Sequence, residues 1–166
     1  IDLEVVVGNQ NIPYQLKVKD NRFDLNFFLS STDLIPDVPE INEPEEYDVA
    51  FDIDEDFIKD FTRAHTSIDK PNRMLINCKT IDKEKFVEFT IGEAATHANK
   101  IKLRTPANFE IGIDDLPFSA ATFREILLAN RLLTGGKISI NEEGLMKVVF
   151  SEDEITATYY LVRLSE

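Results

Sequence analysis

The sequence predicts an α+β protein made of antiparallel sheets and two amphipathic helices. Short alternating runs bounded by polar turns recur along the chain, which is typical of antiparallel strands, whereas apolar residues recur at helical spacing in two places. The predicted order is three opening strands, then strand, helix, four strands, helix and three strands. With 166 residues, 43% of them hydrophobic, the chain can bury one good core or two small ones.

The opening segment predicts an antiparallel meander. Its three β-like runs are separated by polar turns and are Leu3–Val7, Tyr14–Lys19 and Phe23–Leu29. An acidic segment with three prolines follows. From Asp33 to Asp56 there are 11 acidic residues and no Lys or Arg, so we expect a solvated, extended connector.

The segment from Tyr47 onward predicts a complete domain. Asp54 is a good N-cap for a helix that runs to about Ser67. Ser119 caps a second helix that runs to about Leu133 and is stopped by Gly135-Gly136. The predicted strands are Tyr47–Ile53, Met74–Thr80, Lys85–Ile91, Lys100–Arg104, Phe109–Ile113, Lys137–Asn141, Leu145–Phe150 and Ile155–Leu164.

Each predicted helix has one apolar side, because apolar residues recur every three or four positions. They are Phe57, Ile58, Phe61, Ala64, His65 and Ile68 in the first helix, and Phe123, Ile126, Leu127 and Leu133 in the second. Basic residues occupy other faces of both helices.

The closing meander repeats the opening one. Both consist of a glycine, a strand, a tight polar turn, a second strand, a short turn and an aromatic-bearing strand. The internal period is therefore about a domain long, unlike a solenoid repeat. This element order, with an acidic connector after a partial copy, resembles that of DNA sliding clamps of the tailed-phage and proliferating cell nuclear antigen type. Thr158–Val162 is similar to the family's last strand, and Phe118–Leu127 resembles the helix before it.

The resemblance implies a DNA-clamp fold, with antiparallel sheets outside and two helices per domain lining a central channel. Residues 1–32 would be the C-terminal strands of a truncated first clamp domain, 33–46 an acidic interdomain connector, and 47–166 a complete second domain. Since the chain opens at Ile1 inside a strand-like run, we expect upstream residues to be missing. We therefore expect this chain alone to be monomeric or weakly dimeric.

The function implied by the resemblance is a processivity factor without catalysis. A ring, a homotrimer when each subunit carries two domains, would encircle double-stranded DNA without reading its sequence and tether the DNA polymerase, with a clamp loader as a further partner. The alternative is a β-rich phage structural or adaptor protein that oligomerises without binding DNA.

In that family the helices face the DNA, so the resemblance implies phosphate contacts by basic residues on or just after the helices: Lys59, Arg63, Lys70, Arg124 and Arg131. The alternative is that these are ordinary solvated helix faces. Asp60 and Glu125 interrupt the faces, which favours weak, mobile contact. A net charge of −13 repels nucleic acid, but residues 1–58 alone carry 15 acidic and 3 basic residues, so the charge is concentrated there.

The family also binds short hydrophobic peptides of polymerases and loaders between the connector and the last strand. Carried over, this shallow pocket would be lined by Ile35, Pro36, Val38, Tyr160 and Val162. The alternative is that the apolar connector residues hold the connector on the sheet.

The sequence predicts no catalytic set, metal site or cofactor. Asp52, Asp54 and Asp56 alternate but lack the glycine and distal glutamate of an EF-hand. His65 and His97 stand apart, without zinc-ligand spacing. A single cysteine excludes an internal disulfide, and no apolar run is long enough to cross a bilayer. We expect a cytoplasmic protein, in the host cytoplasm if it is phage-encoded.

Overall fold

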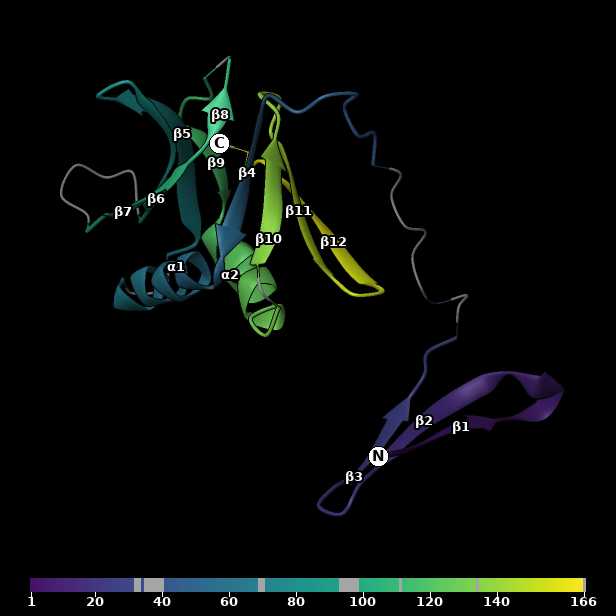
Figure 1. The fold of residues 1–166 in the computed structure, drawn as a ribbon. Coiled ribbons are helices and arrows are strands. Elements are labelled where there is room, and N and C mark those ends of the chain that lie inside the picture. Colours follow the sequence, from purple (N-terminus) through teal and green to yellow (C-terminus); the bar gives the residue numbers. More distant parts are fainter. Residues whose placement is uncertain are drawn as a thin grey trace. The chain divides into compact units, whose positions relative to one another are not determined.

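The computed structural model describes residues 1–31, 34, 41–68, 71–92, 99–110, 112–133 and 135–165. The chain forms two compact units, Ile1–Glu43 and Pro44–Glu166 (Figure 1). The first unit holds one sheet and the second holds two.

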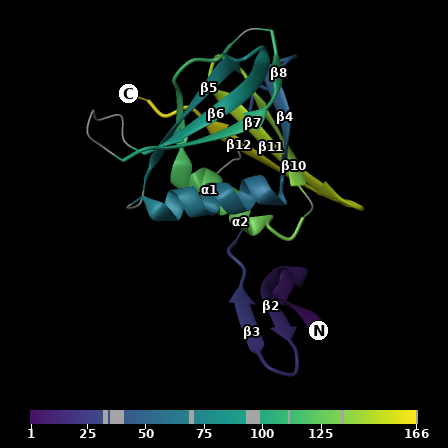
Figure 2. The same cartoon turned by 60° about the vertical axis from the view of Figure 1, so that its left-hand side comes forward.

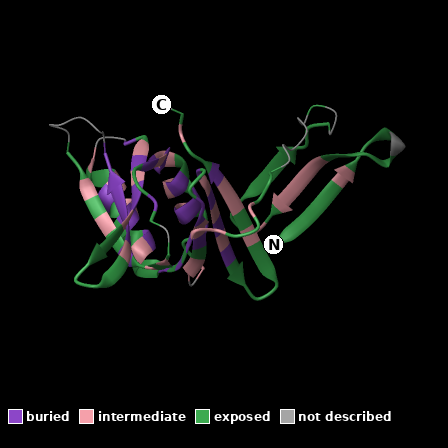
Figure 3. Ribbon diagram, turned by 90° about the horizontal axis from the view of Figure 1, so that it is seen from above, coloured by how far each residue is buried: buried purple, intermediate pink, exposed green. Residues whose placement is uncertain are grey.

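The first unit is a three-stranded antiparallel sheet, as its sequence predicts. Its strands are β1 Asp2–Val7, β2 Pro13–Lys19 and β3 Asp24–Phe28, with a 3-10 turn at Asn9–Asn11 between the first two. The register places Leu3 opposite Val18 and Val18 opposite Leu25, so one face is apolar. Leu3 and Leu25 are exposed, and the whole unit is far less buried than the second (Figure 3).

The second unit holds two antiparallel sheets and two helices. One sheet has the strand order β12-β11-β10-β4-β8, and the other has the order β7-β6-β5-β9. The helices lie beside one another on one side of these sheets (Figures 1 and 2). The elements are β4 Val49–Asp54, α1 Glu55–Ser67, β5 Arg73–Ile81, β6 Glu84–Ile91, β7 Ile101–Pro106, β8 Asn108–Phe109, β9 Leu116–Ser119, α2 Ala120–Ala129, β10 Gly135–Ile140, β11 Leu145–Glu152 and β12 Ile155–Val162.

Both helices begin at the residues that the sequence predicts. The Asp54 carboxylate accepts a hydrogen bond from the Phe57 amide at 2.8 Å, and the Ser119 hydroxyl accepts one from the Thr122 amide at 3.2 Å. These side chains satisfy amides that have no partner inside the helix.

The predicted end of the second helix is wrong. The helix ends at Ala129 rather than near Leu133, and Gly135 begins β10 instead of stopping the helix. Asn130 causes the earlier end, because its side-chain amide donates to the Ile126 carbonyl at 2.8 Å and to the Tyr159 hydroxyl at 3.1 Å. The helix end is thereby joined to β12.

The predicted strand Phe109–Ile113 is also wrong. Only Asn108–Phe109 pair, as β8, and a separate strand β9 begins at Leu116. The buried Asn77 side chain exchanges hydrogen bonds with Asp115, receiving from its amide at 3.0 Å and donating to its carboxylate at 3.2 Å. Asp115 has a φ of 49°, so the chain turns there instead of continuing as a strand.

The core joins the helices to the sheets through phenylalanine rings. The Phe89 ring of β6 is fully buried, and its centroid lies 5.2 Å from Phe57, 5.9 Å from Phe123, 6.0 Å from Phe51 and 6.2 Å from Phe61. These rings come from β4, α1, β6 and α2. The apolar sides of both helices are therefore held against the sheets, and their other sides are left to solvent.

Candidate nucleic-acid interface

The outer side of α1 carries two of the predicted DNA-contacting residues, and both are exposed. Lys59 donates to Glu55 at 3.2 Å and to Asp56 at 3.4 Å, and Arg63 lies 3.8 Å from the Asp60 carboxylate. The hydrogen bond to Glu55, with the one to Asp56, raises the pKa of Lys59, so this amine stays charged. Each cation on this face is thus paired with a carboxylate one turn away.

On α2 the predicted residues differ in exposure. The Arg124 side chain is 28% exposed, and its Nη1 donates to Glu125 Oε1 at 2.6 Å. Arg131 lies after the end of the helix and is exposed. Lys70 lies outside the described residues.

The two helices run in opposite directions. The amide of Ala120, the first residue of α2, donates to the Asn72 carbonyl at 2.9 Å, shortly after α1 has ended. The last turn of α1 therefore lies beside the first turns of α2. Among the described residues, this two-helix surface carries four cations, Lys59, Arg63, Arg124 and Arg131, and as many carboxylates, Glu55, Asp56, Asp60 and Glu125. A surface with balanced charges attracts a polyanion only weakly.

The predicted peptide pocket is described only on its strand side, because Ile35, Pro36 and Val38 lie outside the described residues. Tyr160 and Val162 alternate with the inward-facing residues of β12, so both lie on the outer face of the sheet. Val162 is 71% exposed. The ammonium of Lys147 lies 5.6 Å from the centre of the Tyr160 ring.

Val162 also borders a hollow of about 740 Å³ between the end of β12 and β9. The Leu164 amide donates to the Pro117 carbonyl at 2.9 Å across this seam. The lining consists of Asp114, Asp115, Leu116, Pro117, Glu142, Val162, Arg163, Leu164 and Ser165, so it combines three carboxylates and one arginine with apolar residues. Sequence reasoning missed this acidic lining, because its members come from three separate segments.

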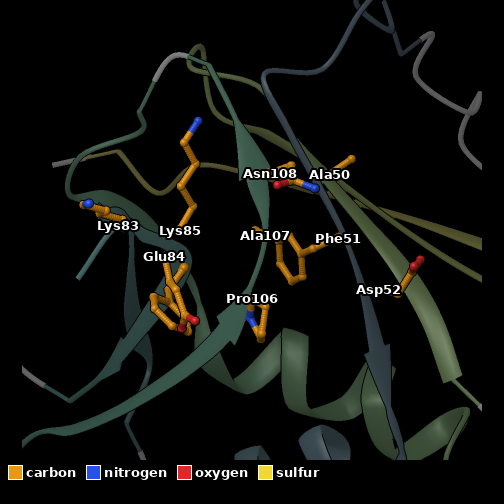
Figure 4. A pocket seen from close by; sticks show the side chains of 10 residues that line it. Ala50, Phe51, Asp52, Lys83, Glu84, Lys85, Pro106, Ala107 and Asn108 are labelled. Atoms are coloured by element: carbon orange, nitrogen blue, oxygen red, sulfur yellow. The ribbon is translucent and has the colours of Figure 1, made fainter. Parts of the chain in front are cut away.

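A second hollow, of about 720 Å³, lies between β4, the β5–β6 turn and the segment Pro106–Asn108 (Figure 4). Lys83 and Lys85 project from its rim in different directions. Lys85 is already engaged, because its ammonium donates to the Phe109 carbonyl and lies 5.1 Å from the centre of that ring. The Lys85 ammonium is therefore not free to bind a ligand in this hollow.

A buried carboxylate on the four-stranded sheet was also missed. Glu88 is 3% exposed and receives hydrogen bonds from Lys102 at 2.8 Å and from Arg104 at 2.7 Å. Burial alone would raise the pKa of Glu88, but the hydrogen bonds and charges of these two cations outweigh it and hold that pKa below its usual value. Because both cations are on β7 and Glu88 is on β6, the cluster ties two strands together.

Among the residues that the structure describes, no three His, Cys, Asp or Glu side chains gather as a metal site would require. In the same part of the chain, no helix is both long and apolar enough to cross a membrane.

No protein-family model and no curated protein sequence matches this chain. By structure, the chain is similar to the crystal structure of the proliferating cellular nuclear antigen from Entamoeba histolytica, with a TM-score of 0.64 and 16% sequence identity. The match covers 91% of this chain and 59% of that one, so the chain spans about three fifths of its neighbour's length. The antiparallel sheets and paired helices are those of the DNA-clamp fold, which confirms the predicted fold class.

Proposed function

We propose that this chain is a subunit of a sliding clamp, which surrounds duplex DNA and tethers a DNA polymerase without catalysing a reaction. The observation that carries this proposal is the DNA-clamp fold itself. A clamp works as a scaffold, so its function requires a surface and a closed ring, and no catalytic group.

The domain arrangement that we propose has residues 1–32 as the last strands of a first clamp domain, 33–46 as a connector and 47–166 as a second, complete domain. Comparison of the two meanders supports it. In the second unit, Ile138, Met146 and Val148 on β10 and β11 are fully buried. In the first unit, Leu3 and Leu25 on the apolar face are exposed. A meander of this kind needs a cover of helices and a second sheet, which a complete first domain would supply.

We propose that α1 and α2 face the DNA and that Lys59, Arg63, Arg124 and Arg131, together with Lys70, contact its phosphates. Phosphate contacts carry no sequence information, so binding would be independent of sequence. Pairing of the cations with carboxylates makes each contact weak. In a ring this weakness is useful, because enclosure rather than affinity keeps the protein on DNA.

For the polymerase and the clamp loader, we propose a docking site at the end of β12, where Tyr160 and Val162 lie on the outer face, with Ile35, Pro36 and Val38 of the connector as further members. The exposed Val162 and the neighbouring hollow support it. Tyr160→Ser should then weaken binding of a partner's hydrophobic peptide by at least about 1 kcal/mol. Unchanged affinity in calorimetric titration would remove this site.

The DNA contact is tested by fluorescence anisotropy on two short duplexes of unrelated sequence at low salt. We expect weak and equal binding to both. Charge reversal to Glu at Lys59, Arg63, Arg124 and Arg131 together should abolish it. The exposed positions Lys59, Arg63 and Arg131 tolerate such changes within about 0.5 kcal/mol each, whereas Arg124 is only 28% exposed, so a thermal melt checks that the variant is folded. The matched control reverses four exposed cations that belong to strands or to a strand turn rather than to the helices: Lys19, Lys79, Lys83 and Lys137.

Equal binding by wild type and the helix variant would refute the DNA-facing assignment. Absence of duplex binding by the wild type would instead favour the adaptor alternative, in which the chain oligomerises without DNA. With the natural polymerase, the same variant should also lose stimulation of processive synthesis.

A further inference from the structure

One face of the three-stranded sheet in the first unit is apolar and open to solvent. Two rows of side chains cross β1, β2 and β3 on this face: Val5, Leu16 and Phe27, and Leu3, Val18 and Leu25. Residues two apart in a strand point to the same side of the sheet, so both rows share this apolar face. On the edge strands the side chains are half exposed or more, at 65% for Leu3, 50% for Val5 and Leu25, and 56% for Phe27.

The opposite face of the same sheet is polar. Its two corresponding rows are Glu4, Lys17 and Asn26, and Asp2, Lys19 and Asp24. Nζ of Lys17 lies 3.4 Å from the Glu4 carboxylate. Water solvates these groups well, whereas the apolar face gains free energy when it is removed from water. The sheet therefore has one side that favours association and one that does not.

A sheet of this size needs its apolar face covered, because three strands become stable only when such a face packs against something. The matching meander in the second unit is covered, since Ile138, Met146 and Val148 are fully buried. In the first unit, the described residues form the sheet and a 3-10 turn, with no α-helix to fill that role. Its cover is thus not supplied by the described residues of this unit.

We propose that a second copy of this 166-residue chain covers the apolar face, so that two first units pack face to face as a two-layered sandwich with a twofold axis. A twofold interface needs a single patch that fits itself, and neither apolar row would bury a charge. Residues 1–31 carry four acidic and three basic side chains, so two sheets repel one another far less than the net charge of −13 on the whole chain suggests.

This inference goes beyond the proposed function and does not rest on it, because the cations proposed for DNA contact all belong to Pro44–Glu166. A complete first clamp domain would cover the same face within one chain, so the two kinds of cover exclude one another. The dimer is therefore a property of the 166-residue chain.

The size of the apolar face predicts a weak dimer. A free Leu or Val side chain presents roughly 100 Å² to water and an aromatic one roughly 200 Å². At the observed exposures, the two rows and Tyr14, which follows the same alternation on β2, leave roughly 400 Å² uncovered on each copy. Two copies would bury roughly 800 Å², less than the about 1,200 Å² of stable complexes, so we expect a dissociation constant on the order of 50 µM.

Two neighbouring phenylalanines on β3 provide a matched pair for the test. Phe27 lies on the apolar face, and Phe28, opposite Gln15, lies on the polar face and is 70% exposed. Sedimentation equilibrium of the full chain between about 5 and about 500 µM, a range centred on the expected dissociation constant, should show a monomer–dimer equilibrium. Phe27→Lys should raise the dissociation constant at least about tenfold, because it places a charge in the apolar interface, whereas Phe28→Lys should change it less than about twofold.

The interface is also tested without any substitution. In a mixture of isotope-labelled and unlabelled wild type, NMR should show nuclear Overhauser effects between the methyl groups of Val5 or Leu25 in one copy and the Phe27 ring in the other. A wild type that stays monomeric at the highest concentration, for example because its own second unit covers the face, would overturn the proposal. Equal effects of Phe27→Lys and Phe28→Lys, or a dimer that lacks these contacts, would place the interface elsewhere, for example at the sheet edges, and would also overturn it.

Discussion

Neutralising two carboxylates on α1, by Glu55→Gln together with Asp60→Asn, should raise the affinity for duplex DNA. Glu55 lies 3.2 Å from the Lys59 amine and Asp60 lies 3.8 Å from the Arg63 guanidinium. Both carboxylates therefore stand next to the groups that we propose contact phosphates. Removing them leaves the cations in place and takes away a repulsion.

The size of the gain follows from Coulomb's law. A phosphate in contact with either cation would lie roughly 6 Å from the paired carboxylate, where two unit charges in water repel by about 0.7 kcal/mol. Screening with a Debye length of about 10 Å reduces this to about 0.4 kcal/mol per pair. Two substitutions then give about 0.8 kcal/mol, which is roughly a fourfold increase in affinity.

The variant is measured by fluorescence anisotropy at an ionic strength of about 0.1 M, the condition used for this screening estimate. Losing the two ion pairs should cost little stability, because exposed pairs on a helix contribute only about 0.3–0.5 kcal/mol each. Asp82→Asn with Glu84→Gln is the matched control, since it makes the same change of charge at the β5–β6 turn, away from the helices (Figure 1). Equal gains in both variants would mean that only net charge matters and would refute a DNA-facing α1.

Three further predictions concern the folded unit that carries this surface. Phe89→Ala should lower the free energy of unfolding by about 4 kcal/mol in urea titrations, since the ring is fully buried among four others, whereas Leu132→Ala at an exposed site should change it little. Glu88→Gln should cost about 1–2 kcal/mol at neutral pH in thermal melts. The pKa of Glu88 is lower in the folded than in the unfolded protein, where a glutamate has a pKa of about 4.3. The stability difference between wild type and Glu88→Gln should therefore be complete above about pH 4.3 and disappear as the pH falls through the folded-state pKa. A difference that does not change with pH would contradict this prediction. Gly135→Ala should cost about 2 kcal/mol or more in urea, because φ is 153° and the added Cβ would lie 2.5 Å from the Ile53 carbonyl oxygen; an unchanged midpoint would contradict it.

Local signals in the sequence were enough to predict most elements. Asp54 and Ser119 cap the helices as predicted, because capping depends on one side chain and an amide three residues away. The alternation of apolar residues places β4, β10 and β11 with the correct face toward the core. Both effects depend only on residues close together in the chain, so they can be recognised from the sequence alone.

The two wrong predictions, the end of α2 and the strand Phe109–Ile113, concern features that are set by contacts between residues far apart in the chain. The end of α2 depends on Asn130 meeting Tyr159, 29 residues away, and the loop before β9 depends on Asn77 meeting Asp115, 38 residues away. The identity of a polar residue does not reveal which distant residue it will hydrogen-bond in the folded protein. The same limit hid the ion pairs of Glu88 and the acidic hollow beside Val162, and it leaves the assignment of the DNA-contacting residues a prediction.

For the sliding clamp that we propose, the charge distribution favours enclosure over affinity as the means of staying on DNA. A chain with a net charge of −13, whose helix cations are paired with carboxylates, cannot hold a polyanion strongly by electrostatics. Long residence then requires a closed ring, and a ring requires surfaces that join subunits. The edge strands of the two sheets of the second unit are β12 and β8 in one and β7 and β9 in the other, and β12 and β7 are the longer edges. Edge strands of this kind pair readily with strands of other chains. If those edges close the ring, the weakness of the helix contacts becomes an advantage, because each phosphate contact can break without releasing the protein and the ring can slide.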